Sequence, residues 1–323
     1  MTHPLDLSVL IATRNRARLL GPTLASLARQ EMNGLRWEVI VIDNNSTDDT
    51  PQVLEQARRT LPLVSLFEPE PGKNRALNQG LKVAKGQLLV FTDDDGTHSN
   101  RWLVDLYQAA QRWPDFDIFC GPIEPTYPPE TPVWLKEEVF TSTAFSKFPP
   151  VWIPPMTEET PFEYHNILPF GPNFAVRRTA MEGVHFDPQM GPQGRSYPMG
   201  GETEFLQRLR ARGCQIIYVP TAQVSHNVDA GQISFDWLFR RAFFYGRGRA
   251  RMDSEPALLQ ILNVPVRYWL KIPLAWVQYQ FSRFGAPCQR FRTGVKYHRL
   301  RGEFYEYRQL ASDPHRQIAK KVK

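Results

Sequence analysis

The sequence predicts an α/β fold: a mostly parallel sheet flanked by helices, followed by a basic helical extension at the C-terminal end. Three observations support this prediction. Short apolar runs alternate with segments of helical periodicity through the first 120 residues, which is typical of a doubly wound sheet. Polar residues directly follow three of these runs. Positive charge is concentrated in the last third of the chain.

The expected strands are short apolar runs bounded by polar residues. They lie at residues 7–12, 37–42, 64–67 and 88–91, and each has the length of a buried strand. Helical spacing of apolar residues separates them, over residues 19–28, 53–57 and 73–84. Further short strands are expected at residues 171–178 and 215–220, with a helix from about residue 202 between them, and residues 223–227 follow the second of these strands.

Composition is that of an ordinary globular protein. The chain has 323 residues, of which 42% are hydrophobic and 22% charged, enough for a sizeable core. Cys120, Cys214 and Cys288 lie far apart, so the spacing predicts neither a zinc site nor a disulfide framework. The first residues lack a signal-peptide pattern, and no apolar segment reaches the roughly 20 residues of a membrane span. We therefore expect a protein of the reducing cytoplasm.

The net charge of +6 hides an uneven distribution. Residues 229–323 carry 18 Lys and Arg against 7 Asp and Glu, whereas residues 1–228 carry 21 against 26. A basic region of this kind can bind nucleic acid, anionic lipid or an acidic partner.

Polar residues at three strand ends predict the functional site. Residues 13–15, Asp43 and residues 93–95 each follow a strand, and ligands of such sheets bind beyond the carboxyl ends of the strands. Lys73 and Arg75 add positive charge at the start of a helix, where backbone N–H groups also favour anions. Together these features predict a site for a nucleotide or a phosphorylated metabolite. Taken singly, Arg14, Lys73 and Arg75 are each better explained as ordinary solvated surface.

Three consecutive carboxylates, Asp93, Asp94 and Asp95, end the strand at residues 88–91. Adjacent acids repel one another unless a cation lies among them. Carboxylate oxygens suit Mg²⁺ or Mn²⁺, so a divalent metal is one interpretation. A solvated acidic loop or a helix cap is the other.

These motifs, at residues 8–15, 41–50 and 91–95, resemble the successive signatures of glycosyltransferase family 2. The resemblance extends over roughly residues 5–228. It implies the GT-A fold, a Rossmann-like arrangement, and transfer of a sugar from a nucleotide-activated donor with inversion. Asn44-Asn45 departs mildly from the family's commoner form at that place.

The resemblance also implies roles for individual residues. Asp43 would accept a hydrogen bond from the base, and Asp93 and Asp95 would form the DXD pair, with Asp95 on the metal and Asp93 on the metal or the ribose. His226 resembles the third metal ligand of many such enzymes, although sequence alone favours an ordinary surface or packed histidine. With an imidazole in the set, Mn²⁺ fits somewhat better than Mg²⁺. The residues expected to bind the nucleotide-sugar are Ala12, Thr13, Arg14, Asn15, Asp43, Asn45, Lys73, Arg75, Asp93 and Asp94.

The sequence around residues 200–205 occupies the place of the family's catalytic acid. Glu202 and Glu204 lie near a helix N-terminus, which favours an ionised carboxylate. The resemblance implies that Glu202 is the base that deprotonates the acceptor. If the alignment with the family motif is shifted, Glu204 takes this role. The alternative without a catalytic role is that both acids simply cap the helix. Asn173 lies on a segment that resembles the one beneath the acceptor.

Residues 122–172 are rich in proline and in aromatic side chains, which predicts a long irregular excursion. Trp134, Trp152, Phe162 and Tyr164 lie in it, and such rings either stack on sugars or pack the loop onto the domain. We assign the excursion to acceptor binding, with Trp152 as the candidate contact. The expected division is a nucleotide-sugar-binding half at 1–120, an acceptor-binding and catalytic half at 121–228, and the extension at 229–323.

The extension combines apolar stripes that contain Trp and Phe with Arg and Lys over residues 235–300. This pattern is typical of helices that lie in a membrane interface. Packing against the catalytic domain or a homo-oligomeric partner is an equal alternative, and we expect no nucleic acid because no recognition motif accompanies the charge. The protein would be cytoplasmic. The alternative is a peripheral position on the cytoplasmic face of the inner membrane.

The sequence therefore predicts a metal-dependent inverting glycosyltransferase that uses a nucleotide-sugar, expected to be UDP-linked, and a glycan or lipid-linked acceptor. One alternative is a non-catalytic protein of the same fold that binds nucleotide-sugar or membrane. A sugar nucleotidyltransferase is the other, but residues 13–16 lack the glycines of its loop.

Overall fold

The computed structural model describes residues 5–141, 156–162, 168–194, 196–253 and 259–310. The chain forms two compact units, each built from more than one stretch of sequence. The first unit contains residues 1–127, 149–188 and 202–228. The second contains residues 128–148, 189–201 and 229–323.

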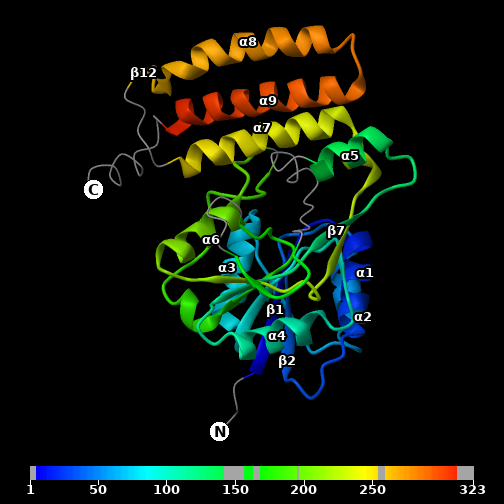
Figure 1. Ribbon diagram of the computed structural model, residues 1–323. Helices are drawn as coiled ribbons and strands as arrows, with labels where there is room; N and C mark the ends of the chain where they lie inside the picture. The colour runs from blue at the N-terminus through cyan, green and yellow to red at the C-terminus, as the bar shows by residue number, and fades with distance from the viewer. Residues whose placement is uncertain (1–4, 142–155, 163–167, 195, 254–258, 311–323) are drawn as a thin grey trace. The chain divides into compact units, whose positions relative to one another are not determined.

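A sheet of eight strands forms the centre of the first unit (Figure 1). Its order is β3-β2-β1-β4-β9-β6-β10-β8. The first four of these pair in parallel, whereas β9 runs antiparallel to both β4 and β6. The strands are β1 (Leu5–Thr13), β2 (Trp37–Asp43), β3 (Leu63–Phe67), β4 (Gly86–Phe91), β6 (Ile118–Cys120), β8 (Thr160–Pro161), β9 (Phe174–Arg177) and β10 (Ile216–Tyr218).

Helices cover both faces of this sheet, because the apolar runs of the inner strands are buried on both sides. On one face, α3 (Lys73–Val83) and α6 (Gly201–Ala211) contribute Leu77 and Phe205 to the core. On the other face, α1 (Ala17–Ala28), α2 (Thr50–Ala57) and α4 (Trp102–Arg112) contribute Leu24, Leu54 and Trp102. The fold class predicted from the sequence is confirmed.

A small second sheet adjoins the acidic triplet. It has the order β5-β11-β7, with β5 (Gly96–His98), β11 (Val224–Asn227) and β7 (Ile123–Thr126). The register pairs His226 with Gly96, and the N–H of Asn227 donates to the carbonyl oxygen of Asp95 at 3.1 Å. This pairing holds His226 next to the last acid of the triplet.

The second unit is helical, and its three long helices lie side by side in Figure 1. Its elements are α5 (Val133–Thr141), α7 (Phe235–Met252), α8 (Val266–Ser282), α9 (Pro287–Leu310) and the hairpin of β12 (Gln260–Ile261) and β13 (Val264–Pro265). Glu306 is fully buried in this unit and accepts from the guanidinium groups of Arg247 and Arg251. Within the described part of the chain, no helix combines the length and apolar character needed to cross a membrane.

The structure corrects one expectation for the proline-rich segment. Residues 133–141, expected to be irregular, form α5. Trp134 packs its ring against Phe235 and Phe291, and Phe162 belongs to the core of the first unit. The rings of Trp134 and Phe162 therefore contribute to the packing within their own units, because each contacts other apolar side chains. Tyr164 lies outside the described residues.

Candidate functional site

The polar ends of β1, β2 and β4 meet at one edge of the sheet. The register pairs Thr13 with Asp43, and Leu10 with Phe91, which is the residue before Thr92 and the triplet. The hydroxyl of Thr13 donates to Oδ2 of Asp94 at 2.7 Å. The three segments that the sequence predicted to share a crevice are therefore neighbours.

Arg16 is the cation that lies among the acids. Its guanidinium donates to Oδ1 of Asp94 and to Oδ2 of Asp95, both at 2.7 Å. Burial opposes the charge of Arg16, but the carboxylates of Asp94 and Asp95 outweigh it and raise its pKa. Sequence reasoning missed this residue as a partner of the triplet, because the two lie 78 and 79 positions apart.

Asp94 and Asp95 are both buried, and their pKa values are shifted in opposite directions. Burial and the neighbouring Asp95 charge raise the pKa of Asp94 to about 6, although Arg16 and Thr13 act in the opposite direction. Burial also opposes the charge of Asp95, but His226 and Arg16 reverse that effect and lower its pKa below the usual value. Of the two, Asp95 is thus the one held as a carboxylate.

His226 and Asp95 carry polar atoms that no hydrogen bond satisfies. Nδ1 of His226 lies 3.2 Å from Oδ1 of Asp95, yet that oxygen and both ring nitrogens lack a hydrogen-bond partner. Both side chains are buried. Buried unsatisfied atoms of this kind are rare, and a nitrogen and a carboxylate oxygen are ligands that Mn²⁺ accepts.

Asp93, the other predicted metal ligand, is directed to Lys73 instead. In the described parts of the chain, no three His, Cys, Asp or Glu side chains form a cluster that could hold a metal by themselves. The residues therefore fit a site with two protein ligands, Asp95 and His226, whose remaining positions would be filled by a ligand such as phosphate.

Lys73 connects the triplet to α6. Its Nζ lies 2.5 Å from Oδ1 of Asp93 and 2.5 Å from Oε1 of Glu202. Burial alone would lower the pKa of Lys73, but the two carboxylates raise it, so the ammonium is charged. This side chain joins two acids that are 109 positions apart in the sequence.

Glu202 and Glu204 differ in what they contact. Besides its contact with Lys73, Glu202 lies against Gly171, where an added Cβ would stand 2.9 Å from Oε1. Glu204 makes two hydrogen bonds to Arg208 within the same helix, at 2.6 and 2.9 Å. Glu202 is therefore the acid of α6 that lies close to the triplet.

The loops after β1 and β2 fold onto one another. Asn15, at a φ of 52°, accepts through Oδ1 from the N–H of Thr47 at 2.7 Å. Asp43 is buried and accepts from the N–H of Ser46 at 2.9 Å. Asn45, at a φ of 62°, donates to the carbonyl oxygen of Pro69. These contacts give the loops a defined shape at the sheet edge.

The remaining predicted site residues are placed differently. Ala12 is half-buried, and the side chains of Arg14 and Arg75 are exposed near the edge. Asn173 is fully buried; its amide accepts from the Trp102 indole and donates to two backbone carbonyls. These hydrogen bonds hold Asn173 within the scaffold, and its role in acceptor binding stays a prediction. Trp152 lies outside the described residues.

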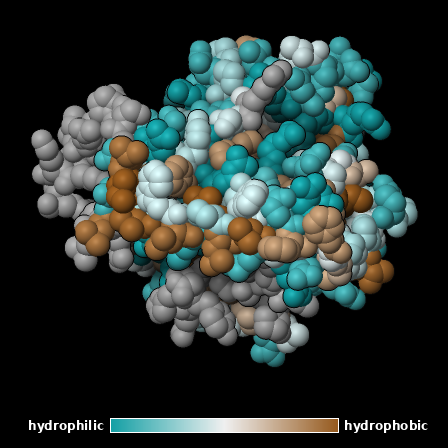
Figure 2. Space-filling model, turned by 90° about the horizontal axis from the view of Figure 1, so that it is seen from above, coloured by the Kyte–Doolittle hydropathy of each residue, from teal (hydrophilic) through white to brown (hydrophobic). Residues whose placement is uncertain are grey.

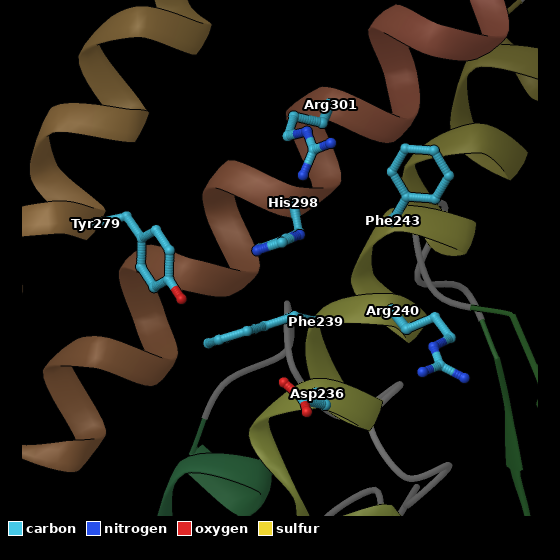
Figure 3. Close-up of a pocket in the computed structure, with 7 residues that line it drawn as sticks. All are labelled: Asp236, Phe239, Arg240, Phe243, Tyr279, His298 and Arg301. Carbon is cyan, nitrogen blue, oxygen red and sulfur yellow. The ribbon is translucent and has the colours of Figure 1, made fainter. Parts of the chain in front are cut away.

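The helical unit has a pocket of its own, with a volume of about 410 Å³. Its lining residues belong to α7, α8 and α9, and Figure 3 shows their rings and charged groups around it. Phe239 stacks on His298 at 4.9 Å, and both contact Tyr279. Burial and the neighbouring Arg301 charge lower the pKa of His298 to about 4. The lining residues are Asp236, Phe239, Arg240, Phe243, Tyr279, His298 and Arg301.

Comparison with known sequences agrees with this geometry. The model of the family "Glycosyl transferase family 2" matches residues 8–184. The succinoglycan biosynthesis protein ExoM of Rhizobium meliloti is 29% identical over 267 residues, which cover 80% of both chains. The GalNAc(5)-diNAcBac-PP-undecaprenol beta-1,3-glucosyltransferase of Campylobacter jejuni is 35% identical over 107 residues, covering 32% of this chain and 34% of that protein.

Solved structures share the fold. The mannosyltransferase PcManGT of Pyrobaculum calidifontis, in complex with GDP-Man and Mn²⁺, matches with a TM-score of 0.57 and 19% identity, covering 97% of this chain and 89% of that one. TarS 1–349 of Staphylococcus aureus, in complex with UDP, matches with a TM-score of 0.54 and 17% identity, covering 97% and 92%. Since the family model covers more than half of the sequence, the chain belongs to glycosyl transferase family 2 and is a glycosyltransferase.

Proposed function

We propose that the protein transfers a sugar from a nucleoside diphosphate donor to a hydroxyl of a glycan or lipid-linked acceptor, with inversion at the anomeric carbon. The position of Lys73 carries this proposal. Its ammonium lies 2.5 Å from both Asp93 and Glu202. It therefore connects Asp93, which is expected to bind the donor, with Glu202, which is expected to be the base. Substrates bound at these two acids would be adjacent.

The reaction is a single displacement. The acceptor oxygen forms a bond to the anomeric carbon while the bond from that carbon to the diphosphate oxygen breaks, and the nucleoside diphosphate leaves with the electron pair. Glu202 takes the proton of the attacking hydroxyl as general base. Lys73 contacts this carboxylate and fixes its position beside the triplet.

The nucleoside would lie at the ends of β1 and β2, where the buried Asp43 can accept a hydrogen bond from a base. Uracil and guanine both offer a ring N–H to such a carboxylate. TarS is described with UDP and PcManGT with GDP-Man. We propose a UDP-sugar as the donor, and the test below includes both bases.

Asp95 and His226 would hold a divalent cation, Mn²⁺ or Mg²⁺. Their unsatisfied buried atoms support this assignment, as does the Mn²⁺ in the PcManGT complex. When bound, the ion would supply positive charge against the diphosphate. Asp93, Asp94 and Arg16 would position the donor from the chain itself, Asp93 on the ribose side.

The acceptor would be presented at the cytoplasmic face of a membrane. The name of the Campylobacter jejuni relative describes transfer to an undecaprenol-linked glycan. The positive charge of residues 229–323 would favour an anionic surface. The roles of residues 1–120 in donor binding and of residues 121–228 in acceptor binding belong to the same proposal.

Substitution of the two acids of α6 tests the proposed base. Glu202→Gln should lower kcat by about 10² to 10⁴-fold, the usual worth of a general base. Glu204→Gln is the matched control, because it makes the same change two residues away in a carboxylate paired with Arg208. Its kcat should stay within about threefold of the wild type. The measurement is release of nucleoside diphosphate from UDP- and GDP-sugars with a panel of polyprenyl-linked glycans.

A large loss in Glu204→Gln with little loss in Glu202→Gln would reverse the assignment. Donor binding is tested separately by thermal unfolding with UDP or GDP, each with and without Mn²⁺. A ligand at about 100 times its Kd should stabilise the protein by about 2.7 kcal/mol. If neither nucleotide raised the midpoint in the presence of metal, the donor site would be wrong whatever the fate of Glu202.

A further inference from the structure

One side of α8 is apolar and exposed. Its members recur at alternating intervals of four and three residues, which return to the same side of a helix. They are Leu270, Leu274, Val277, Phe281 and, just past the helix end, Phe284, with exposed fractions of 74%, 59%, 40%, 76% and 93%. Single exposed apolar residues are ordinary, but a continuous row marks an interaction surface.

The opposite side of α8 is the one that packs within the unit. Tyr268, Ala275 and Ser282 are buried there. Figure 3 shows Tyr279 directed toward His298 of α9 and Phe239 of α7. The exposed row is therefore not needed to attach α8 to its neighbours.

The apolar row continues into the hairpin before α8. Leu259, Ile261 and Leu262 are exposed by 74%, 51% and 66%, and the N–H of Val266 donates to the carbonyl oxygen of Leu259. Figure 2 shows a band of hydrophobic side chains crossing this face of the molecule. We call residues 259, 261, 262, 270, 274, 277, 281 and 284 the apolar band.

Aromatic and basic side chains border the band on α8. Trp269 and Trp276 each precede a member of the row and are 38% and 47% exposed. Lys271 directly follows Leu270 and lies on the side of the row opposite to the two tryptophans. Arg267 and Arg283 lie near the two ends of α8. Tryptophan and long cationic side chains are the residues that occupy the boundary between lipid tails and headgroups.

The charges of α8 decide between two occupants of the band. A second copy of the chain could pair along the same spacing, as in a coiled coil. However, α8 itself contains no Asp or Glu, and of its cations Arg267 is paired with Asp253 outside the helix. Two α8 helices packed along this row would therefore bring Lys271 toward the other helix with no acid on either helix to balance it. A surface of anionic lipid supplies the opposite charge and an apolar interior.

We propose that the apolar band is a docking surface for an anionic phospholipid bilayer, with α8 lying in the plane of the interface. The apolar row enters the region between headgroups and acyl chains, and Lys271 and Arg283 contact lipid phosphates, whereas Arg267 is paired with Asp253. This inference does not depend on the sugar-transfer proposal, because its readout is vesicle binding alone.

The test is sedimentation of the full-length protein with two kinds of vesicle, phosphatidylcholine alone and phosphatidylcholine mixed with phosphatidylglycerol. The wild type should bind the anionic vesicles more strongly, and added salt should weaken this binding. The triple substitution Leu270→Ser, Leu274→Ser, Phe281→Ser should lower the partition coefficient at least about tenfold. Lys271→Gln and Arg283→Gln should each lower it by about fivefold at low salt.

A matched pair of single substitutions controls for general loss of surface hydrophobicity. Val277→Ser, in the band, should lower the partition coefficient, whereas Val133→Ser on α5, whose valine is 69% exposed, should not. All substituted side chains are exposed, so the unfolding midpoint should stay unchanged, and circular dichroism checks this. The proposal is overturned if the wild type fails to bind anionic vesicles or if the triple variant binds as well as the wild type. A dimer in solution that the triple variant dissociates, without vesicle binding, would assign the band to a second copy.

Discussion

At the scale of residues, the protein's own side chains offset part of the negative charge around the acidic triplet. Arg16 pairs with Asp94 and Asp95, and Lys73 pairs with Asp93 and Glu202. Two cations therefore reduce the repulsion among four acids that suggested a metal from sequence. The unsatisfied atoms of Asp95 and His226 are the further observation that favours a metal.

Removing the ammonium of Lys73 should damage both stability and activity. Lys73→Met keeps the length of the side chain but leaves Asp93 and Glu202, each about one-fifth exposed, as unpaired like charges. We expect a loss of about 3 kcal/mol in the free energy of unfolding, as for a broken buried pair. Lys82→Met, at the exposed end of the same helix, should cost less than about 0.5 kcal/mol. Urea unfolding measures both, and equal losses would show that Lys73 has no special role.

His98 should make stability depend on pH. It lies fully buried between the hydroxyls of Ser26 and Thr92, at 2.8 and 2.9 Å, and burial lowers its pKa from 6.5 to about 3. The folded state therefore binds fewer protons than the unfolded state between these values. The stabilisation is complete above pH 6.5 and is lost as the pH falls toward 3, by up to about 1.4 kcal/mol per pH unit.

Urea unfolding of the wild type and His98→Gln across this pH range checks the effect, since the difference between the two curves isolates His98 from the acidic groups. The wild type should lose stability more steeply with acid. Parallel curves would mean that His98 becomes protonated in the folded protein without penalty.

At the scale of elements, the sequence located the strands better than the helices of the last third. The strand prediction succeeded because each inner strand is a short apolar run closed by polar residues, and β1 to β4 lie within two residues of their predicted bounds. Helix α9 was not predicted as a separate element, although it begins within the residues 235–300 assigned to a helical extension. Its buried side contains Gly294, Gly302, Glu303 and Glu306 beside apolar residues, so hydrophobic periodicity does not reveal it.

The pairing of α7 with α9 depends on glycine at the points of closest approach. A Cβ at Gly302 would stand 2.0 Å from the carbonyl oxygen of Phe243, and one at Gly246 would stand 2.0 Å from that of Arg299. These backbone contacts cannot relax by rotating a side chain. They also could not be predicted, because nothing in the sequence identifies the partner of a helical glycine.

Gly302→Ala should therefore force the helices apart and lower the free energy of unfolding by about 1–3 kcal/mol. Gly21→Ala is the control: Gly21 is also helical, but outside its chain neighbours and its own helix backbone no atom lies within 4 Å of its added Cβ. Helix propensity favours this change, whereas the following Pro22 opposes a Cβ at this position, so the free energy of unfolding should change by less than about 1 kcal/mol. Calorimetric unfolding of both variants is the measurement. If Gly302→Ala left the free energy of unfolding unchanged, α7 and α9 would have room for a Cβ at this position, contrary to the close approach described above.

At the scale of the whole molecule, the candidate site residues and the apolar band belong to different units. Each unit is built from stretches that are separated in the sequence. Residues 128–148 and 189–201 group with residues 229–323. Trp134 packs on Phe235 and Phe291, Glu138 accepts from Arg292 at 2.8 Å, and the N–H of Met199 donates to the carbonyl oxygen of Phe244. These contacts join segments that a boundary between residues 228 and 229 would separate.

A chain that ends at Val228 should consequently lack the partners of α5 and of residues 189–201. Trp134 would lose both rings against which it packs, and the buried Glu138 would lose its arginine. We expect the shortened chain to bind a hydrophobic dye and to be cleaved by protease within residues 128–148 and 189–201, whereas the full-length triple serine variant of α8 resists both. Mass spectrometry of the fragments locates the cuts. If the shortened chain resisted protease as well as the full chain does, the predicted boundary at 228/229 would separate independent domains. Deleting residues 229–323 would then test membrane binding as well as the substitutions in α8 do.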